Sequence, residues 1–123
     1  MPHRRQNLAS ERPGITKKLT IPAPDGELAC YVTVSFFEDG RPGEVLLRAN
    51  KQGSAERGLL HTLGIMISLL LQHGVKMEKI VEKLQGVAFD PAGMTGDKAI
   101  PMVTSIVDYL AKWLSKHEFS QKH

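Results

Sequence analysis

Cysteine and long hydrophobic runs are scarce in this sequence of 123 residues. The one cysteine, Cys30, cannot form an internal disulfide, so the fold does not depend on oxidation and a reducing cytoplasm is the expected location. The longest apolar stretch, Leu63 to Leu71, is far shorter than the roughly 18 to 20 residues that cross a bilayer. The N-terminal segment is charged and lacks an apolar core, so it does not resemble a secretory signal. We therefore expect a soluble cytoplasmic protein with no membrane contact.

Motifs for metal binding and nucleophilic catalysis are also lacking. The sequence has no C-x-x-C, H-E-x-x-H, EF-hand or G-x-S-x-G pattern. His61 and His73 lie twelve positions apart on one predicted helix, which is too far to share a metal ion. Cys30 alternates with apolar residues on a predicted strand, where a thiol behaves as a small hydrophobic group. We expect no metal site, no cofactor and no nucleophilic cysteine.

The charge is mild, with a formal net value of +3. Basic and acidic residues are mixed through most of the chain, so contact with nucleic acid is permitted but not required. Residues 1–14 have no hydrophobic period, and we predict a flexible basic arm there that either contacts phosphates or is simply solvated. Its basic residues include Arg4, Arg5 and Arg12. Residues 15–116 are expected to form a single domain, followed by a frayed tail at 117–123.

Period-two alternation predicts an antiparallel sheet in the first half of the chain. Residues 27–37 alternate cleanly, which places one set on a core face and the other set, including Tyr31 and Phe37, on the opposite face. The core set is Leu28, Cys30, Val32, Val34 and Phe36. After a turn, residues 44–49 are predicted to form the second strand of a hairpin, and residues 18–21 to add a third strand.

The hydrophobic period becomes helical after Asn50. Ser54 is a candidate N-cap for a long helix that ends near Gly74. Apolar residues cover so much of this helix, from Leu59 to Leu71, that we expect it to be covered on more than one side. Its excess apolar surface predicts a homo-oligomer, which sedimentation of a monomer alone at micromolar concentration would exclude.

Two further helices are predicted after Gly74. A short helix at 76–85 is followed by a loop at 87–99, and a last helix runs over 101–116 with Pro101 in its first turn. The predicted fold class is therefore α+β, a two- to three-stranded antiparallel sheet followed by three helices packed on it.

Two glycine-containing segments are candidates for holding a phosphate at the start of a helix. Residues 50–54 read Asn-Lys-Gln-Gly-Ser and lead directly into the long helix, so Lys51 and Ser54 are candidate ligand-binding residues. The loop at 89–98 carries two glycines ahead of the last helix. Neither segment is a P-loop, because G-x-x-x-x-G-K-[ST] is absent. An ordinary capped helix start is the alternative interpretation.

Short segments in a fixed order run along most of the chain. They read Arg-Pro-Gly at 12–14, Tyr-Val-Thr-Val at 31–34, Glu-Asp-Gly-Arg-Pro-Gly-Glu-Val at 38–45, Lys-Gln-Gly-Ser at 51–54, Ile-Ser-Leu at 67–69, Gly-Val at 74–75, Phe-Asp-Pro-Ala-Gly at 89–93 and Thr-Ser-Ile-Val-Asp-Tyr-Leu-Ala-Lys-Trp-Leu at 104–114. Their order and spacing resemble the TSCPD domain. That domain is found near the C-terminus of vitamin B12-dependent ribonucleotide reductases and also alone. The resemblance spans residues 12–114, nearly the whole chain.

The run that gives the family its name departs from the pattern here. The family run is Thr-Ser-Cys-Pro-Asp. Thr104, Ser105 and Asp108 match its first, second and last residues, but Ile106 replaces the cysteine and Val107 replaces the proline. Any redox or metal role of that cysteine is therefore lost. The family enzyme resembles a large barrel with a thiyl-radical cysteine and a reducing cysteine pair, and the cysteine-rich tail that often accompanies the domain is missing here. We therefore expect no reductase reaction from these residues on their own.

Three functions remain after these exclusions. The resemblance favours a non-catalytic accessory or regulatory domain that binds protein, in particular a ribonucleotide reductase subunit in trans. The alternative is a nucleotide- or nucleic-acid-binding module that uses the basic arm and the glycine-led helix N-termini, with an affinity that falls steeply with salt. A small enzyme would have to assemble Asp90, Asp97, Lys98 and Asp108, the one nearby polar group in the sequence.

The candidate ligand-binding residues are polar loop and turn residues of the resemblance. They are Lys51, Ser54, Asp90, Thr104, Ser105 and Asp108. Ser105 and Asp108 are three positions apart, so they would lie on one face of a helix. Helix caps and loop anchors are the alternative interpretation of these residues.

Overall fold

Three long strands form an antiparallel sheet in the computed structural model, which describes residues 4–50 and 54–117. β1 spans Gly14–Ala23, β2 spans Gly26–Phe36 and β3 spans Pro42–Ala49, in that order across the sheet. β1 pairs with β2 along its whole length, so it is longer than the segment predicted from the sequence. The N-terminal half of β1 is largely polar and shows no apolar alternation, so the sequence pattern did not predict it as a strand. Pairing with β2 supplies its backbone hydrogen bonds.

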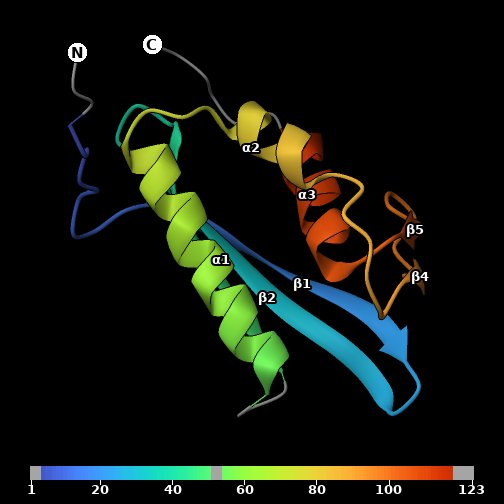
Figure 1. Cartoon of the computed structure of the whole chain (residues 1–123). Coiled ribbons are helices and arrows are strands. Elements are labelled where there is room, and N and C mark those ends of the chain that lie inside the picture. Colours follow the sequence, from blue (N-terminus) through green and yellow to red (C-terminus); the bar gives the residue numbers. More distant parts are fainter. Residues whose placement is uncertain (1–3, 51–53, 118–123) are drawn as a thin grey trace.

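Three helices follow the sheet and lie on one of its faces (Figure 1). α1 spans Ala55–Gln72, α2 spans Met77–Leu84 and α3 spans Ile106–Lys116. α1 packs on β3, while α3 packs beside β1 and on α2. A short hairpin of β4 (Gly93–Met94) and β5 (Met102–Val103) lies between α2 and α3. The predicted α+β class, a sheet followed by three helices, is confirmed.

The hydrophobic core lies between the sheet and the helices. One face of the sheet contributes alternate residues from all three strands, namely Leu19, Ile21, Leu28, Cys30, Val32, Val34, Val45, Leu47 and Ala49. The helices contribute, among others, Leu60, Ile67, Ile80, Ile106 and Leu110. The opposite face of the sheet is open in the described structure, where Tyr31 is 44% and Leu46 is 48% exposed. The fold is therefore two layers with one uncovered sheet face.

Gly64 lets α1 lie directly on β3. A Cβ atom at this position would lie 2.9 Å from the carbonyl oxygen of Val45 and 3.2 Å from the amide nitrogen of Leu47. Ser68, one turn later, joins the same two elements, because its hydroxyl accepts a 2.9 Å hydrogen bond from the Val45 amide and donates at 3.1 Å to the Val45 carbonyl. These contacts fix the position of α1 along the strand.

The last helix begins later than predicted. The sequence placed its start at Pro101, whereas α3 begins at Ile106. The intervening residues pair as β5 with β4, and Ser105 accepts a hydrogen bond from the Asp108 amide as the N-cap. The prediction was wrong because the fixed φ of proline suits an extended segment as well as a first helical turn, and the cap decides the boundary.

The end of β2 departs from the predicted alternation. Phe37 was placed with the set facing away from the core, yet its side chain is 4% exposed. The pairing register with β3 shifts between Ser35 and Phe36, so the period-two pattern stops before Phe37. The guanidinium of Arg41 lies 4.9 Å from the centre of the Phe37 ring.

The segment predicted as a basic arm makes hydrogen bonds to the domain. Nε of Arg5 donates at 2.6 Å to Oε1 of Gln72, and Arg12 forms a 2.8 Å ion pair with Glu44. Gln72 is buried at the end of α1 and also donates at 3.0 Å to the carbonyl of Gly43 in β3. No pattern in the sequence predicts this use of Gln72. The flexibility of the arm stays a prediction, but both of these arginines are engaged within the chain.

Candidate functional site

Thr104, Ser105 and Asp108 come together at the start of α3. The Asp108 carboxylate is 0% exposed, and it accepts backbone hydrogen bonds from Gly86 at 2.7 Å and from Thr104 at 2.9 Å. Lys112, one turn further along α3, places its Nζ 2.8 Å from Oδ2 of the same carboxylate. Each carboxylate oxygen therefore has a donor, and the bond to Gly86 ties the end of α2 to the start of α3.

Ser105 caps α3 and also holds the loop that precedes it. Its hydroxyl accepts from the Asp108 amide at 3.0 Å and donates to the carbonyl of Val87 at 2.6 Å. The Thr104 hydroxyl donates to the same carbonyl at 2.9 Å. We call Gly86, Val87, Thr104, Ser105 and Asp108 the α3-start network. Its three side chains act as a helix cap and as loop anchors, which was the alternative interpretation of the sequence.

The environment of Asp108 keeps its carboxyl ionised. Burial raises the pKa of Asp108, but the hydrogen bond from Lys112 and the amides of Thr104 and Gly86 outweigh burial and hold the pKa below its usual value. The carboxylate is therefore charged at neutral pH and is not suited to general acid or base work there. Its donors belong to the fold itself, so the arrangement serves as a structural anchor.

The other predicted ligand-binding residues lie apart from this network. Lys51 lies outside the described residues. Ser54 is the N-cap of α1 and accepts a 3.2 Å hydrogen bond from the amide of Arg57, as its place in the sequence predicted. Asp90 is exposed on the loop after α2. Of the candidates that the structure describes, it gathers only those at the start of α3.

Asp97 and Asp108 belong to separate hydrogen-bond networks. The four polar residues considered for a small enzyme therefore do not form one site. Oδ2 of Asp97 accepts a 2.9 Å hydrogen bond from the hydroxyl of Tyr109, and Oδ1 accepts at 2.9 Å from the amide of Ala99. Burial raises the pKa of Tyr109 to about 12, and the hydrogen bond to Asp97 acts in the same direction. Asp97 therefore holds the segment between β4 and β5 against α3.

The glycine-containing loop at 89–98 does not present a helix N-terminus. It contains β4 of the β4–β5 hairpin, and Gly93 and Gly96 take φ values of 123° and 82° that favour glycine. The start of α3 lies beyond that hairpin and is capped by Ser105. These glycines precede the last helix, as predicted, but they lie within the β4–β5 hairpin and not immediately before the first residue of α3.

The described residues offer no built metal or redox site. Within 4–50 and 54–117, no three His, Cys, Asp or Glu side chains gather closely enough to hold a metal ion. Burial raises the pKa of the Cys30 thiol to about 11, so the thiol is protonated and unreactive at neutral pH. In the same ranges every buried side-chain nitrogen or oxygen has a hydrogen-bond partner, so none of these atoms needs a ligand to complete its hydrogen bonding.

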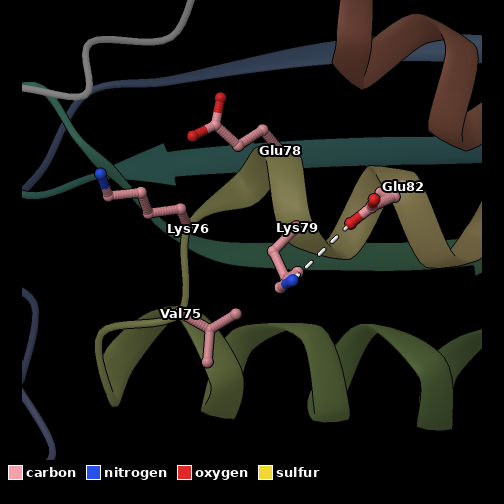
Figure 2. Close-up of a pocket in the computed structure, with 5 residues that line it drawn as sticks. All are labelled: Val75, Lys76, Glu78, Lys79 and Glu82. Carbon is pink, nitrogen blue, oxygen red and sulfur yellow. Dashed lines mark ion pairs between the residues drawn. The ribbon is translucent and has the colours of Figure 1, made fainter.

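A hollow of about 600 Å³ opens beside α2 (Figure 2). Its lining residues are Val75, Lys76, Glu78, Lys79 and Glu82. Figure 2 shows Lys79 and Glu82 pointing toward one another, with 3.8 Å between Nζ and Oε1, and both side chains are largely exposed. The two lysines and two glutamates balance in charge, so the hollow favours neither an anion nor a cation.

The outer side of α1 is apolar and exposed. Leu59 is 70% exposed, Met66 51%, Ile65 45% and Leu70 41%. We call these four residues the α1 apolar face. Leu59, Met66 and Leu70 are spaced by seven and four positions, so they line one side of the helix, while Ile65 lies about 100° around the helix from Met66 and exposes a neighbouring part of its surface. The sequence predicted a helix covered on more than one side, but within the described residues this side is open.

Among the residues that the structure describes, neither α1 nor any other helix combines the length and apolar content that a membrane crossing requires. Single exposed apolar residues are common on any surface, but a group on successive turns of one helix is typical of a protein contact.

Comparison with known proteins identifies the domain. The family model described as the TSCPD domain matches residues 4–118. The vitamin B12-dependent ribonucleotide reductase of Rhodopirellula baltica is 38% identical over 111 residues, which cover 90% of this chain and 10% of the relative. The proteins of the same name from Streptomyces avermitilis and Agrobacterium fabrum are 40% and 37% identical, over 90% and 94% of this chain and 11% and 9% of the relatives. No solved structure gives a significant match.

These relatives are far larger than the matched segment. The chain spans about a tenth of the length of each of these three curated relatives. The similarity therefore concerns this domain and not the rest of those proteins.

Proposed function

Because this chain belongs to the TSCPD domain family, we propose that it is a non-catalytic accessory domain that binds a subunit of ribonucleotide reductase in the cytoplasm. Its relatives, which bear the name vitamin B12-dependent ribonucleotide reductase, carry the matching segment as about a tenth of their length. A large reductase chain is thus the usual neighbour of this domain. The observation that carries the proposal is the α1 apolar face, since an exposed apolar helix face favours contact with another protein.

The α3-start network supports the non-catalytic part of the proposal. The polar residues kept from the family-naming run are Thr104, Ser105 and Asp108, and each binds backbone groups of its own chain. Cys30, the chain's one cysteine, is 1% exposed in the core, where it is unsuited to redox chemistry. The proposal therefore assigns these residues to holding the fold and assigns recognition to α1.

The partner surface should be apolar and should accept a helix. Leu59 and Met66 are the two most exposed members of the α1 apolar face, and neither belongs to the hydrophobic core. Burying such partly exposed side chains contributes about 1 kcal/mol each. Since about 1.4 kcal/mol is a tenfold change in affinity, removing two of them should weaken binding by about tenfold or more.

Isothermal titration calorimetry tests this proposal directly. The ligand is a purified vitamin B12-dependent ribonucleotide reductase of the source organism, with its own TSCPD segment deleted if it has one. Wild-type chain should bind, and the double variant Leu59→Ser/Met66→Gln should bind about tenfold more weakly. The matched control is Leu46→Ser, which removes a leucine of 48% exposure from the open sheet face and should bind as the wild type does.

Three results would count against the proposal. The first is the absence of binding by the wild type, and the second is an equal loss in the control and in the double variant. The third is self-association through α1 that the reductase does not displace, which would make the occupant of this face a second copy and the chain a homo-oligomer.

A further inference from the structure

We propose that the open face of the sheet binds single-stranded nucleic acid, with a base stacked on Tyr31 and phosphates held by Lys18 and Arg48. This face lies on the side of the sheet away from the core and the helices (Figure 1). The inference is independent of the docking proposed for α1, because the two surfaces share no residue.

The three side chains form one row across the sheet. Lys18 on β1 is paired directly with Tyr31 on β2, and Tyr31 is paired directly with Arg48 on β3. Directly opposite residues of an antiparallel sheet share a face, with Cβ atoms about 4.5 to 5.5 Å apart. Nζ of Lys18 lies 5.7 Å from the centre of the Tyr31 ring. An aromatic ring of 44% exposure therefore lies between two cations.

The neighbouring row of side chains on the sheet leaves room for a nucleic-acid strand. Thr16, Thr33 and Leu46 are paired in the same way, two positions along from the first row. The hydroxyls of Thr16 and Thr33 are 2.9 Å apart. These side chains are short or apolar, so they leave the row at Tyr31 accessible and add hydroxyl groups and a leucine for contacts to sugars and bases.

The acidic residues of this face do not cancel its central charge. Glu44 is neutralised by its 2.8 Å ion pair with Arg12. Glu27 lies four positions from Tyr31 on β2, about 13 Å along the strand at 3.3 Å per residue. That is beyond the screening length of about 8 Å in physiological salt. The centre of the face is therefore positive, which suits the phosphates of a polyanion.

The aromatic ring is what favours nucleic acid over an acidic polypeptide. Bases stack on exposed aromatic side chains with little regard to sequence, and an open sheet is a common platform for this. A base can reach such a ring only when it is not already stacked within a duplex. The row therefore fits a single strand better than a double helix, and a polyglutamate chain would use only the two cations.

Fluorescence anisotropy with a labelled oligodeoxythymidylate of about twenty nucleotides, enough to cover one binding face, tests the proposal. Tyr31→Ser should weaken binding about fivefold to a hundredfold, whereas Tyr31→Phe keeps the ring and should stay within about twofold of the wild type. Lys18→Gln with Arg48→Gln should reduce the slope of log affinity against log salt by about 1.4, the value for two lost phosphate contacts on a single strand. Circular dichroism confirms that each variant is folded.

The control for charge is Lys79→Gln, because Lys79 is a 67%-exposed cation on α2, away from the sheet face. It should leave both the affinity and the salt slope unchanged. The proposal is overturned if the wild type does not bind at low salt, if Tyr31→Phe loses as much as Tyr31→Ser, or if Lys79→Gln reduces the salt slope equally. Equal competition by polyglutamate, or tighter binding of a duplex of the same length, would also overturn it.

Discussion

The amide of Gly86 donates a 2.7 Å hydrogen bond to Oδ1 of Asp108, 22 positions further along the chain. Through this bond and that of the Thr104 amide, one buried carboxylate joins the end of α2 to the start of α3. Ile106 and Val107 stand where the family pattern has cysteine and proline, and they occupy the first turn of α3. Ile106 is 2% exposed in the core, so the replacement of the cysteine fits a packing role.

Removing the Asp108 carboxylate should destabilise the domain strongly. Asp108→Ala leaves two backbone amides without their acceptor and Lys112 without its ion pair, and the loss of one partner from such a buried charged network costs about 3 kcal/mol. Urea denaturation at neutral pH measures the change in the free energy of unfolding. The control is Asp90→Ala on an exposed loop, expected within about 0.5 kcal/mol of the wild type. Similar small changes in both variants would contradict the structural role given to Asp108.

The same carboxyl should make the stability depend on pH on the acid side. Its pKa is lowered in the folded state, so its contribution is present above the unfolded value of about 3.9 and is lost as the pH falls through the folded pKa. The free energy of unfolding should therefore fall as the pH is lowered below about 4. Asp108→Asn should show a shallower fall over that range in parallel denaturation curves, and an unchanged slope would contradict the assignment.

Two glycines of α1 should respond in opposite directions to alanine. Gly64→Ala forces a Cβ to within 2.9 Å of the Val45 carbonyl, and such overpacking against backbone should destabilise by about 1 to 3 kcal/mol. Gly58 has no atom within 4 Å of its would-be Cβ, so Gly58→Ala should stabilise the helix by about 0.5 to 1 kcal/mol. Thermal unfolding of the two variants checks both signs. A stabilised Gly64→Ala variant would show that α1 does not lie so closely on β3.

Local periodicity was enough to predict the sheet and the helices. The alternation of residues 27–37 is a property of one strand, and α1 repeats its apolar residues along its own length, so both could be recognised without knowing their partners. The start of α3 could not be predicted from local periodicity, because it depends on the pairing of β5 with β4 and on the cap at Ser105. The α1 apolar face was predicted as excess apolar surface, but which side stays open depends on the packing of β3.

The polar contacts were less accessible to sequence reasoning. The row of Lys18, Tyr31 and Arg48 exists only through the pairing register, since these residues are far apart in the chain. Gln72 looks like an ordinary polar residue at a helix end, and its role follows from contacts with Arg5 and Gly43. Spacing could relate Ser105 to Asp108 because they share one helical turn, but it could not show that Gly86 completes the network.

Site-specific labelling at Met66 tests whether α1 is the surface that binds a reductase. Cys30 is buried and burial raises its thiol pKa to about 11, so a cysteine introduced by Met66→Cys is the one that takes an environment-sensitive dye. Adding the reductase should give a saturable blue shift of the dye at this position, and none for a dye at Ala92→Cys on an exposed loop. A reductase that binds without shifting the dye at Met66, or that does not bind at all, would contradict the assignment of α1 as the binding surface.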